Sequence, residues 1–405
     1  MANWERSRLG DLVETQKGYA FKSGWYCGEG RPIVKVSDFT GDSVDSTALV
    51  CIPEETAISY LRYELRAGDV VVQTVGSWPT NPASVVGKCV RIPGEVAGAL
   101  LNQNAVKLTP ANGFDRTFLF YLLRNEEFKI YIIGTAQGAA SQAAITLDAI
   151  RGYKFPLPPL PIQRRIAGIL SAYDALIENS QRRIRILEAM ARALYREGLG
   201  FGSISAANQP IIESPYWRFI SENVGRYSGT KRYYATADIN GLAITGQGID
   251  YSFAEKPSRA QKEPILNSVW FARMKDTYKI AWYGPLKDER VSGVMLSSGF
   301  AGFEAQDSEM WPLLFLTISS KEFHVQKDLY CTGATQMSLT NEGLARISMP
   351  LPGEDAARWL GRKAGPILSA IAGLQQRNNN LRRTRDLLLP RLLSGQIDVE
   401  ALDHA

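Results

Sequence analysis

One polar loop in the first half of the chain carries side chains that could recognise bases in DNA. Amide, guanidinium and ammonium groups reach base edges, whereas hydroxyl groups more often contact phosphates. Residues 73–81 are polar and turn-rich, and they lie between two apolar runs typical of strands. We expect them to contact DNA; the alternative is an ordinary surface turn. The candidate contact residues of this loop are Gln73, Ser77, Trp78, Thr80 and Asn81.

Basic residues accompany this loop and form a denser group in the second half of the chain. Residues 226–279 hold 9 basic and 5 acidic side chains with tyrosines between them, a pattern typical of nucleic-acid-binding surfaces. The alternative is a solvated charged face beside a tyrosine-rich edge of the core. The candidates near the loop are Lys17, Lys22, Arg31 and Lys35, and those of the second half are Lys231, Arg232, Tyr233, Arg259, Lys262, Arg273 and Lys275.

The sequence offers no constellation that could carry catalysis. An amino-methyltransferase would need Asn or Asp before Pro-Pro and an aromatic residue, but Leu157 precedes Pro158-Pro159. The two histidines, His324 and His404, form no arrangement with a serine and an acid that spacing could support. We therefore expect no catalytic residue.

The acidic residues and cysteines give equally little support for a metal centre. Asp115 with Glu127 weakly resembles a nuclease metal site, but a solvated helix face explains these residues more simply. No cysteine pair has the two-residue spacing of a zinc site, and no disulfide framework is indicated. We expect no metal, no cofactor and a reducing cytoplasmic location. The four cysteines are Cys27, Cys51, Cys89 and Cys331.

The positive charge of the chain is concentrated in two segments. Residues 1–161 hold 16 basic and 16 acidic side chains, and residues 198–353 hold 15 of each. Residues 162–197 hold 7 basic and 4 acidic side chains, and residues 354–393 hold 8 and 3. If the chain binds DNA, it does so through local patches or with a partner that neutralises phosphates. No apolar run approaches the roughly 18 residues of a membrane span.

The elements that would position these residues occur twice. Ser141 to Pro158 reads SQAAITLDAIRGYKFPLP, and Thr335 to Pro352 reads TQMSLTNEGLARISMPLP, without a gap, 194 residues later. Fainter matches join 127–128 to 322–323, 68–71 to 267–270 and 38–41 to 238–241. A period this long indicates a duplicated domain rather than a solenoid of short repeats. Because the copies share little sequence, we expect one fold with two different surfaces.

Within the first copy, short β-type runs alternate with turns. We expect strands at 32–36, 69–73 and 85–90 and a helix over 118–128. The second copy shows the same style of short strands and turns. Each copy is therefore predicted to be a mixed α/β domain.

A long helix is predicted after each copy. In residues 162–197 apolar side chains recur every seven residues for about four heptads, the pattern of a coiled coil. In the second stretch Pro366 and Pro390 restrict the predicted helix to about 366–389. Its apolar row includes Asn378, which either sets register inside the seam or is exposed at the seam's edge. Two such helices in one chain most simply pack antiparallel. The first would be roughly 54 Å long, more than the 34–36 Å of a DNA turn.

Two segments of the chain resemble the conserved regions of a known family. Leu157 to Arg183 is similar to the central conserved region of type I restriction–modification specificity subunits, and Arg382 to Val399 is similar to their distal conserved region. The chain departs from the family at 353–355, where a second proline–glutamine motif would be expected. The resemblance implies two target-recognition domains, each reading half of a split sequence in double-stranded DNA. It also implies docking of two methyltransferase subunits and of restriction subunits, without catalysis by this chain.

We therefore expect an α+β protein, with two mixed α/β target-recognition domains in tandem, separated by two long helices packed as an antiparallel coiled coil. The predicted boundaries are 1–156 for the first domain, 157–200 for the central helix, 201–352 for the second domain and 353–405 for the distal helix and tail. The predicted function is DNA sequence specificity in a type I restriction–modification complex. The alternatives are the recognition part of a related, type IIB-like restriction–methylation enzyme and a coiled-coil adaptor that does not bind DNA.

Overall fold

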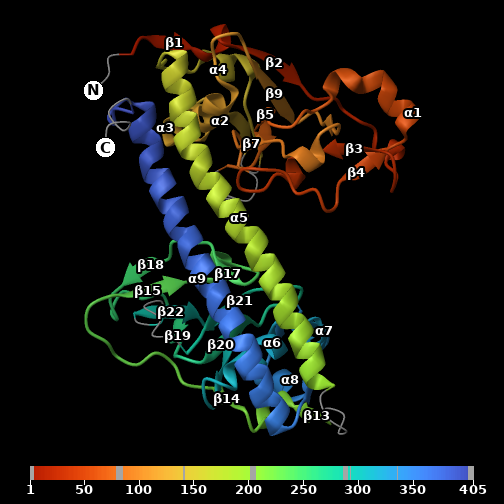
Figure 1. Cartoon of the computed structure of the whole chain (residues 1–405), viewed down its shortest axis with the longest axis vertical. Coiled ribbons are helices and arrows are strands. Elements are labelled where there is room, and N and C mark those ends of the chain that lie inside the picture. Colours follow the sequence, from red (N-terminus) through yellow and green to blue (C-terminus); the bar gives the residue numbers. More distant parts are fainter. Residues whose placement is uncertain are drawn as a thin grey trace. The chain divides into compact units, whose positions relative to one another are not determined.

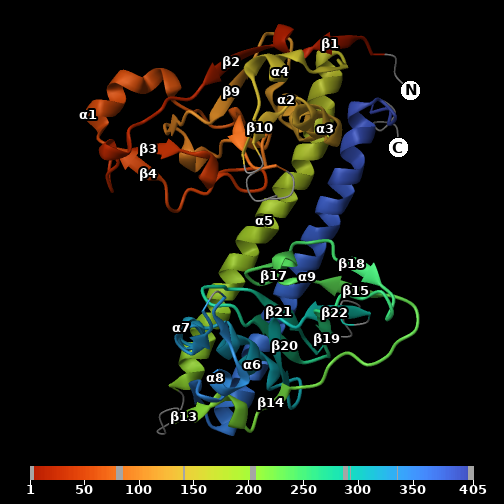
Figure 2. The same ribbon diagram turned by 180° about the vertical axis from the view of Figure 1, so that it is seen from behind.

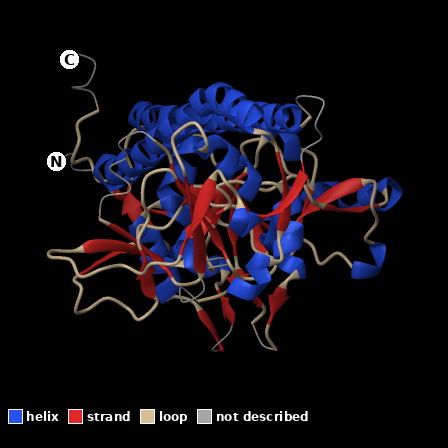
Figure 3. Ribbon diagram, turned by 90° about the horizontal axis from the view of Figure 1, so that it is seen from below, coloured by secondary structure: helices blue, strands red, loops and turns tan. Residues whose placement is uncertain are grey.

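The computed structural model describes residues 4–78, 85–139, 142–200, 207–285, 291, 293–334 and 336–399. The chain forms two compact units. Unit 1 combines Met1–Ile177 with Asn380–Ala405, and unit 2 is Glu178–Asn379. Both units contain strands and helices. Figure 3 shows the two kinds of element over the chain. Two long helices, α5 (Leu160–Leu199) and α9 (Glu354–Leu393), each contribute one part to either unit (Figure 1).

Unit 1 is built around a four-stranded antiparallel sheet with two helices against it. The strands of this sheet contain buried valines and leucines. Asp115 and Asn125 cap the two helices by accepting hydrogen bonds from backbone amides. Unit 1 also contains a smaller sheet of three strands. The large sheet is ordered β2 (Val13–Lys17), β9 (Ala105–Pro110), β5 (Val70–Gln73) and β7 (Cys89–Arg91), the small sheet β4 (Val50–Ile52), β3 (Arg31–Val34) and β8 (Leu100–Leu101), and the helices are α2 (Arg116–Arg124) and α3 (Glu126–Gly134).

Unit 2 repeats this plan. When the strands of each large sheet are counted in chain order, both large sheets have the order first, fourth, second, third. The second sheet of each unit contains one parallel pair of strands. The large sheet is ordered β14 (Trp217–Ile220), β23 (Phe300–Ala305), β20 (Ser268–Ala272) and β21 (Ile280–Tyr283), the second sheet β18 (Ile249–Tyr251), β15 (Lys231–Tyr234), β22 (Val294–Ser297) and β19 (Ala260–Lys262), and the helices are α6 (Trp311–Ile318) and α7 (Lys321–Leu329).

The repeated segment folds alike in both copies, which confirms the predicted duplication. A strand, a short helix and a second strand follow one another, and that second strand pairs with an early strand of the same copy. Thr146 and Thr340 each cap the short helix by accepting a backbone hydrogen bond of 3.1 Å. In unit 1 these elements are β11 (Gln142–Ala144), α4 (Leu147–Gly152), β12 (Lys154–Pro156) and the early strand β1 (Arg6–Arg8), and in unit 2 they are β25 (Ser338–Leu339), α8 (Asn341–Ala345), β26 (Ser348–Leu351) and β13 (Ala207–Pro210).

The fainter sequence matches also correspond to equivalent backbone positions. The carboxylates of Asp38 and Asp238 accept hydrogen bonds of 2.8 and 2.7 Å from the amide three residues before them. Gly68 and Asn267 both adopt a left-handed backbone, with φ of 83° and 59°. A side chain other than Gly or Asn would be strained there. The copies therefore keep the turns as well as the sheets.

The long helices pack antiparallel, as predicted. In unit 1 the guanidinium of Arg385 on α9 pairs with the carboxylate of Asp174 on α5. In unit 2 the end of α5 at Gly198 lies against Trp359 and Leu360, near the start of α9. The predicted apolar rows of α5 are buried or half-buried throughout. Figure 2 shows α7 and α8 of unit 2 beside the same end of α5.

The prediction that prolines restrict the second helix to 366–389 is wrong, because α9 is continuous through Pro366 and Pro390. Proline removes one helical hydrogen bond, but the turns before Pro366 are held by tertiary packing. Ala357 and Leu360 are buried in the core of unit 2, and Gly361 lies so close to Glu309 that a Cβ atom would be 2.0 Å from its carbonyl oxygen. Packing therefore outweighs the local preference of the prolines.

Two other expectations about helices need correction. The helix predicted over 118–128 is divided at Asn125, whose extended backbone ends α2 and whose side chain caps α3. The alternative that Asn378 is exposed at the edge of the seam is also wrong, since this residue is only 3% exposed. Ser180 on α5 is likewise buried. Both are polar groups within the apolar packing of α5 and α9 in unit 2. A position of this kind can specify register.

The remaining elements are short. They are α1 (Glu54–Ala57), β6 (Val75–Gly76), β10 (Gln137–Ala139), β16 (Ile239–Asn240), β17 (Ala243–Ile244) and β24 (Cys331–Thr332), in addition to several 3-10 turns. Across the described ranges, no helix combines the length and apolar character that crossing a membrane would require.

The ion pair between Asp174 and Arg385 should stabilise unit 1 strongly. Both side chains are largely buried, and Asp174 also accepts a hydrogen bond from the Tyr121 hydroxyl. Asp174→Ala removes the shortest of three carboxylate contacts of the buried Arg385 guanidinium, which keeps Asp386 at 2.9 Å and Asp42 at 3.9 Å. It also removes the acceptor of the Tyr121 hydroxyl, so it should lower the free energy of unfolding by about 1–3 kcal/mol. Urea denaturation followed by circular dichroism measures this change. The control is Glu178→Ala, which removes the exposed pair with Arg182 and should cost about 0.5 kcal/mol or less. Equal losses in the two variants would contradict the prediction.

Candidate nucleic-acid interface

The predicted contact loop of unit 1 is only partly available to a ligand. Gln73 is fully buried at the end of β5, and its amide donates a 2.9 Å hydrogen bond to the carbonyl of Val75. Ser77 forms a β-bridge with Val85, and Trp78 packs half-buried against the core of unit 1. Thr80 and Asn81 lie outside the described residues. In this conformation Gln73 serves the sheet rather than a surface.

The four basic candidates of unit 1 have different surroundings. Lys17 is exposed at the end of β2. Lys22 lies 5.5 Å from the ring centre of Trp25, and Lys35 lies 5.7 Å from that of Tyr26. All three cations keep their charge available to solvent or to an aromatic ring.

Arg31 differs from these lysines because its guanidinium is fully engaged within unit 1. It pairs with the carboxylates of Glu54 and Glu64 and donates a 3.1 Å hydrogen bond to the carbonyl of Gly98. Hydrogen bonding to Glu54 is the largest of the effects that raise the pKa of Arg31. With two carboxylates around one guanidinium, Arg31 supports the structure of the small sheet rather than attracting a polyanion.

An aromatic cluster beside these cations was missed by the sequence analysis. The ring centres of Tyr19 and Tyr60 are 4.5 Å apart, and those of Trp25 and Tyr60 are 5.9 Å apart. Tyr19, Trp25 and Tyr60 are each half-buried, so part of each ring faces solvent. The aromatic spacing within 19–26 was the available signal. Aromatic rings next to lysines can contact sugars and bases as well as phosphates.

Most basic candidates of unit 2 are tied to the protein itself. Lys231 pairs with Glu263, and its ammonium lies 4.9 Å from the ring centre of Tyr227. Lys262 donates to the carbonyl oxygens of Ser221 and Glu222, at 3.1 and 3.3 Å. These two lysines hold neighbouring segments of unit 2 together.

The remaining basic candidates divide into engaged and exposed residues. Arg273 donates to the carbonyl of Leu339 and the side chain of Asn341, and burial lowers its pKa. Lys275 lies beside Met337, with its ammonium 3.8 Å from the sulfur. Arg259 is exposed, and no ion pair to it occurs in the described part of the chain.

Arg232 and Tyr233 lie next to each other on β15, on opposite faces of the strand. Tyr233 packs against Tyr251 with ring centres 6.3 Å apart. Arg232 is half-exposed and forms two parallel hydrogen bonds with Asp250, which lies directly opposite it on β18. The role of Asp250 could not be predicted from the sequence, because an acidic residue in a basic stretch gives no local signal of its partner.

The comparisons with known proteins identify the first part of the chain. Residues 1–189 match the family model described as the type I restriction modification DNA specificity domain. These residues are similar to that domain. Over 98% of the chain and 94% of the relative, the sequence is 22% identical to a protein named as the specificity subunit of a type I restriction enzyme, MjaX, from Methanocaldococcus jannaschii. The MjaVIII specificity subunit of the same organism is 28% identical over 44% of this chain and 40% of that one.

A solved structure shares the fold of this chain over nearly its whole length. A crystal structure of the type I restriction–modification system S subunit from M. genitalium superposes with a TM-score of 0.53. The two proteins share 16% identity, and the match covers 96% of each chain. At this identity the likeness concerns the fold, which includes both copies of the duplicated domain and the two long helices.

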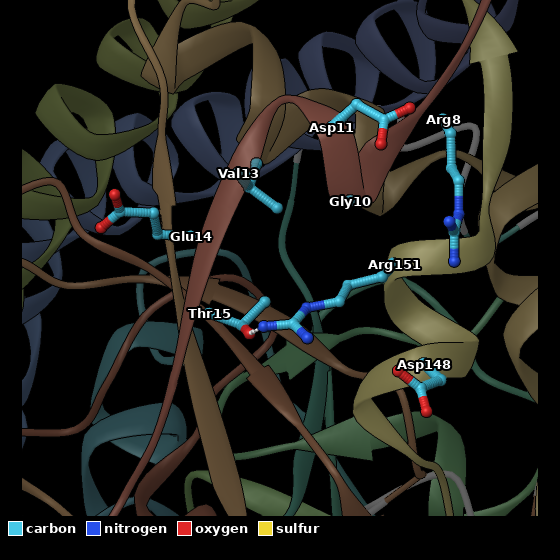
Figure 4. Close-up of a pocket in the computed structure, with 8 residues that line it drawn as sticks. All are labelled: Arg8, Gly10, Asp11, Val13, Glu14, Thr15, Asp148 and Arg151. Atoms are coloured by element: carbon cyan, nitrogen blue, oxygen red, sulfur yellow. Dashed lines mark hydrogen bonds between the residues drawn. The ribbon is translucent and has the colours of Figure 1, made fainter.

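Unit 1 also contains an open cavity of about 530 Å³ (Figure 4). The Arg151 guanidinium donates a hydrogen bond to the Thr15 hydroxyl across it. In the second copy the residue equivalent to Arg151 is Ala345, so this hydrogen bond is not repeated there. Its lining mixes arginines with carboxylates and includes no histidine or cysteine; the residues are Arg8, Gly10, Asp11, Val13, Glu14, Thr15, Asp148 and Arg151. The described ranges contain no cluster of three potential metal ligands.

His324 is half-buried in unit 2 and packs against aromatic rings. Its ring lies between Phe323 and Tyr278, with ring centres 5.4 and 4.7 Å away. Neither ring nitrogen has a hydrogen-bond partner of normal geometry among the described residues. Burial, followed by the nearby Lys327 ammonium, lowers the pKa of His324 from 6.5 to about 4.

This pKa shift should make unit 2 sensitive to acid. Below pH 6.5 the unfolded chain binds a proton at His324 that the folded chain does not bind until about pH 4. The free energy of unfolding is therefore unaffected by His324 well above pH 6.5, and it decreases as the pH falls from 6.5 toward 4. Between pH 7 and pH 4.5, wild type should lose roughly 2–3 kcal/mol relative to His324→Phe, measured by urea denaturation. An equal loss in both proteins would contradict this assignment.

Proposed function

We propose that this chain is the DNA sequence-specificity subunit of a type I restriction–modification complex and recognises a bipartite, asymmetric target in double-stranded DNA. The observation that carries the proposal is the duplication of one fold in a chain whose first copy is a specificity domain. Two copies of a DNA-reading domain on one chain would read two half-sites. Their differing side chains would make the half-sites different.

The two copies offer different groups to DNA. We assign residues 1–156 and 201–352 as the two target-recognition domains. The first would use Lys17, Lys22 and Lys35 beside its aromatic cluster, together with the loop that ends at Asn81. The second would use Arg232 and Arg259, which are the most exposed of its basic candidates. The engaged cations would orient neighbouring segments rather than contact phosphates.

The two long helices would dock the partners of the complex. They carry the excess positive charge of the chain, since residues 162–197 hold 7 basic and 4 acidic side chains and residues 354–393 hold 8 and 3. Two methyltransferase subunits would bind this chain, restriction subunits would join that core, and all chemistry would take place on the partners. The duplication favours two equivalent docking positions, one for each copy.

The test is to co-express the chain with its cognate methyltransferase subunit and to map methylated adenines across the genome by single-molecule sequencing. We expect one split motif, with two unlike half-sites around a fixed gap. Cells that express the methyltransferase subunit alone are the control and should lack this motif. A stable complex that methylates no defined sequence would contradict the proposal and would favour a coiled-coil adaptor without DNA binding.

The balance of charges leads to a second expectation. Since residues 1–161 and 198–353 are each neutral, the isolated chain should bind duplex DNA weakly. The methyltransferase subunits should add phosphate contacts and steepen the dependence of the binding constant on salt. Fluorescence anisotropy at several salt concentrations, with and without the methyltransferase subunits, measures both slopes. Equal slopes would contradict the idea that partners supply phosphate neutralisation.

A further inference from the structure

Arg232 is held in place at both ends of its side chain. At the head, Nε donates to one carboxylate oxygen of Asp250 at 2.8 Å and Nη2 donates to the other at 2.7 Å. At the stem, Gly248 lies so close that a Cβ atom there would be 2.8 Å from Cγ of Arg232. Gly248 has a φ of 64°, so this approach combines a glycine-type backbone with the absence of a side chain. The guanidinium is thus positioned before any ligand arrives.

The Asp250 contact leaves a defined part of the guanidinium free for recognition. A guanidinium carries five N–H donors, and Asp250 accepts from two of them along the Nε side. Three donors remain on Nη1 and Nη2. Tyr234, on the same face of β15, also interacts with the guanidinium. Two donors still suffice for two parallel hydrogen bonds from the end of the side chain.

Exposure and a single carboxylate partner together distinguish Arg232 from Arg31 and Arg218. Its side chain is 50% exposed and faces one carboxylate, whereas that of Arg31 is 24% exposed and faces two. Arg218 is as exposed as Arg232, at 55%, but it also faces two carboxylates, those of Glu222 and Glu304. An excess of carboxylates repels DNA and occupies the donors. Arg232 therefore combines a fixed orientation, solvent access and free paired donors.

We propose that Arg232 reads a guanine in the half-site bound by the second copy, and that Asp250 is the positioning residue for this contact. Guanine presents two acceptors, O6 and N7, on its major-groove edge, and an arginine fork is the side chain that matches them. Adenine presents a donor in place of O6 and is rejected. This assignment rests on the proposed function, because it requires that unit 2 meets the major groove.

The experiment compares variants of the full chain, each co-expressed with the methyltransferase subunit and analysed by genome-wide mapping of methylated adenines. Arg232→Lys keeps the charge and can keep an ion pair with Asp250, but it lacks the fork. We expect it to reduce discrimination for a G·C pair at one position of one half-site by roughly 5- to 150-fold. Arg232→Gln should relax the same position. Asp250→Asn should relax it to a smaller extent, because one acceptor for the guanidinium is kept.

Arg218→Gln is the matched control, since it removes an equally exposed and paired arginine of the same unit and should leave the motif unchanged. Two outcomes would overturn the guanine assignment alone: a split wild-type motif that Arg232→Lys leaves intact, or methylation that falls evenly at all sites. The second would indicate a phosphate contact or a folding role. A wild-type complex without any split motif would instead overturn the proposed function, so the two failures are distinguishable.

Discussion

The antiparallel packing of α5 and α9 is the interaction on which both units depend. The core of unit 1 includes Ile166 and Leu170 from α5 and Leu392 from α9, and the core of unit 2 takes Tyr195 and Leu360 from the opposite parts of the same helices. Neither helix could bury its apolar rows alone. Each copy of the duplicated domain therefore completes its core with helical segments that are distant from one another in sequence.

The duplication separates what the fold requires from what recognition can vary. Leu9 and Ile211 each donate a 2.8 Å hydrogen bond to the carbonyl that precedes the last strand of their copy, and this bond ties the beginning of each copy to its end. Such backbone interactions constrain few side chains. The surfaces have diverged accordingly, since aromatic rings and lysines characterise the first copy and a buttressed arginine the second.

Much of this architecture could be predicted because its signals are local or repetitive. An ungapped repeat of 18 residues and heptads of apolar residues survive without knowledge of the tertiary structure. The course of α9 through Pro366 could not be predicted, because packing around Gly361 decides it. Which cations are already paired with carboxylates could not be predicted either. Glu54 lies 23 residues from Arg31, and Asp250 lies 18 residues from Arg232, so only strand pairing reveals which charges are already neutralised.

The composition of unit 1 also affects how the chain can fold during synthesis. Leu389, Leu392 and Leu393 belong to its core, yet the ribosome adds them only after all of unit 2. At translation rates of roughly 5–20 residues per second, about 10–40 seconds separate Ile177 from Leu389. During that interval the apolar face of α5 in unit 1 lacks its native cover. A nascent chain of this kind therefore completes the core of its first copy only after its second copy has been made.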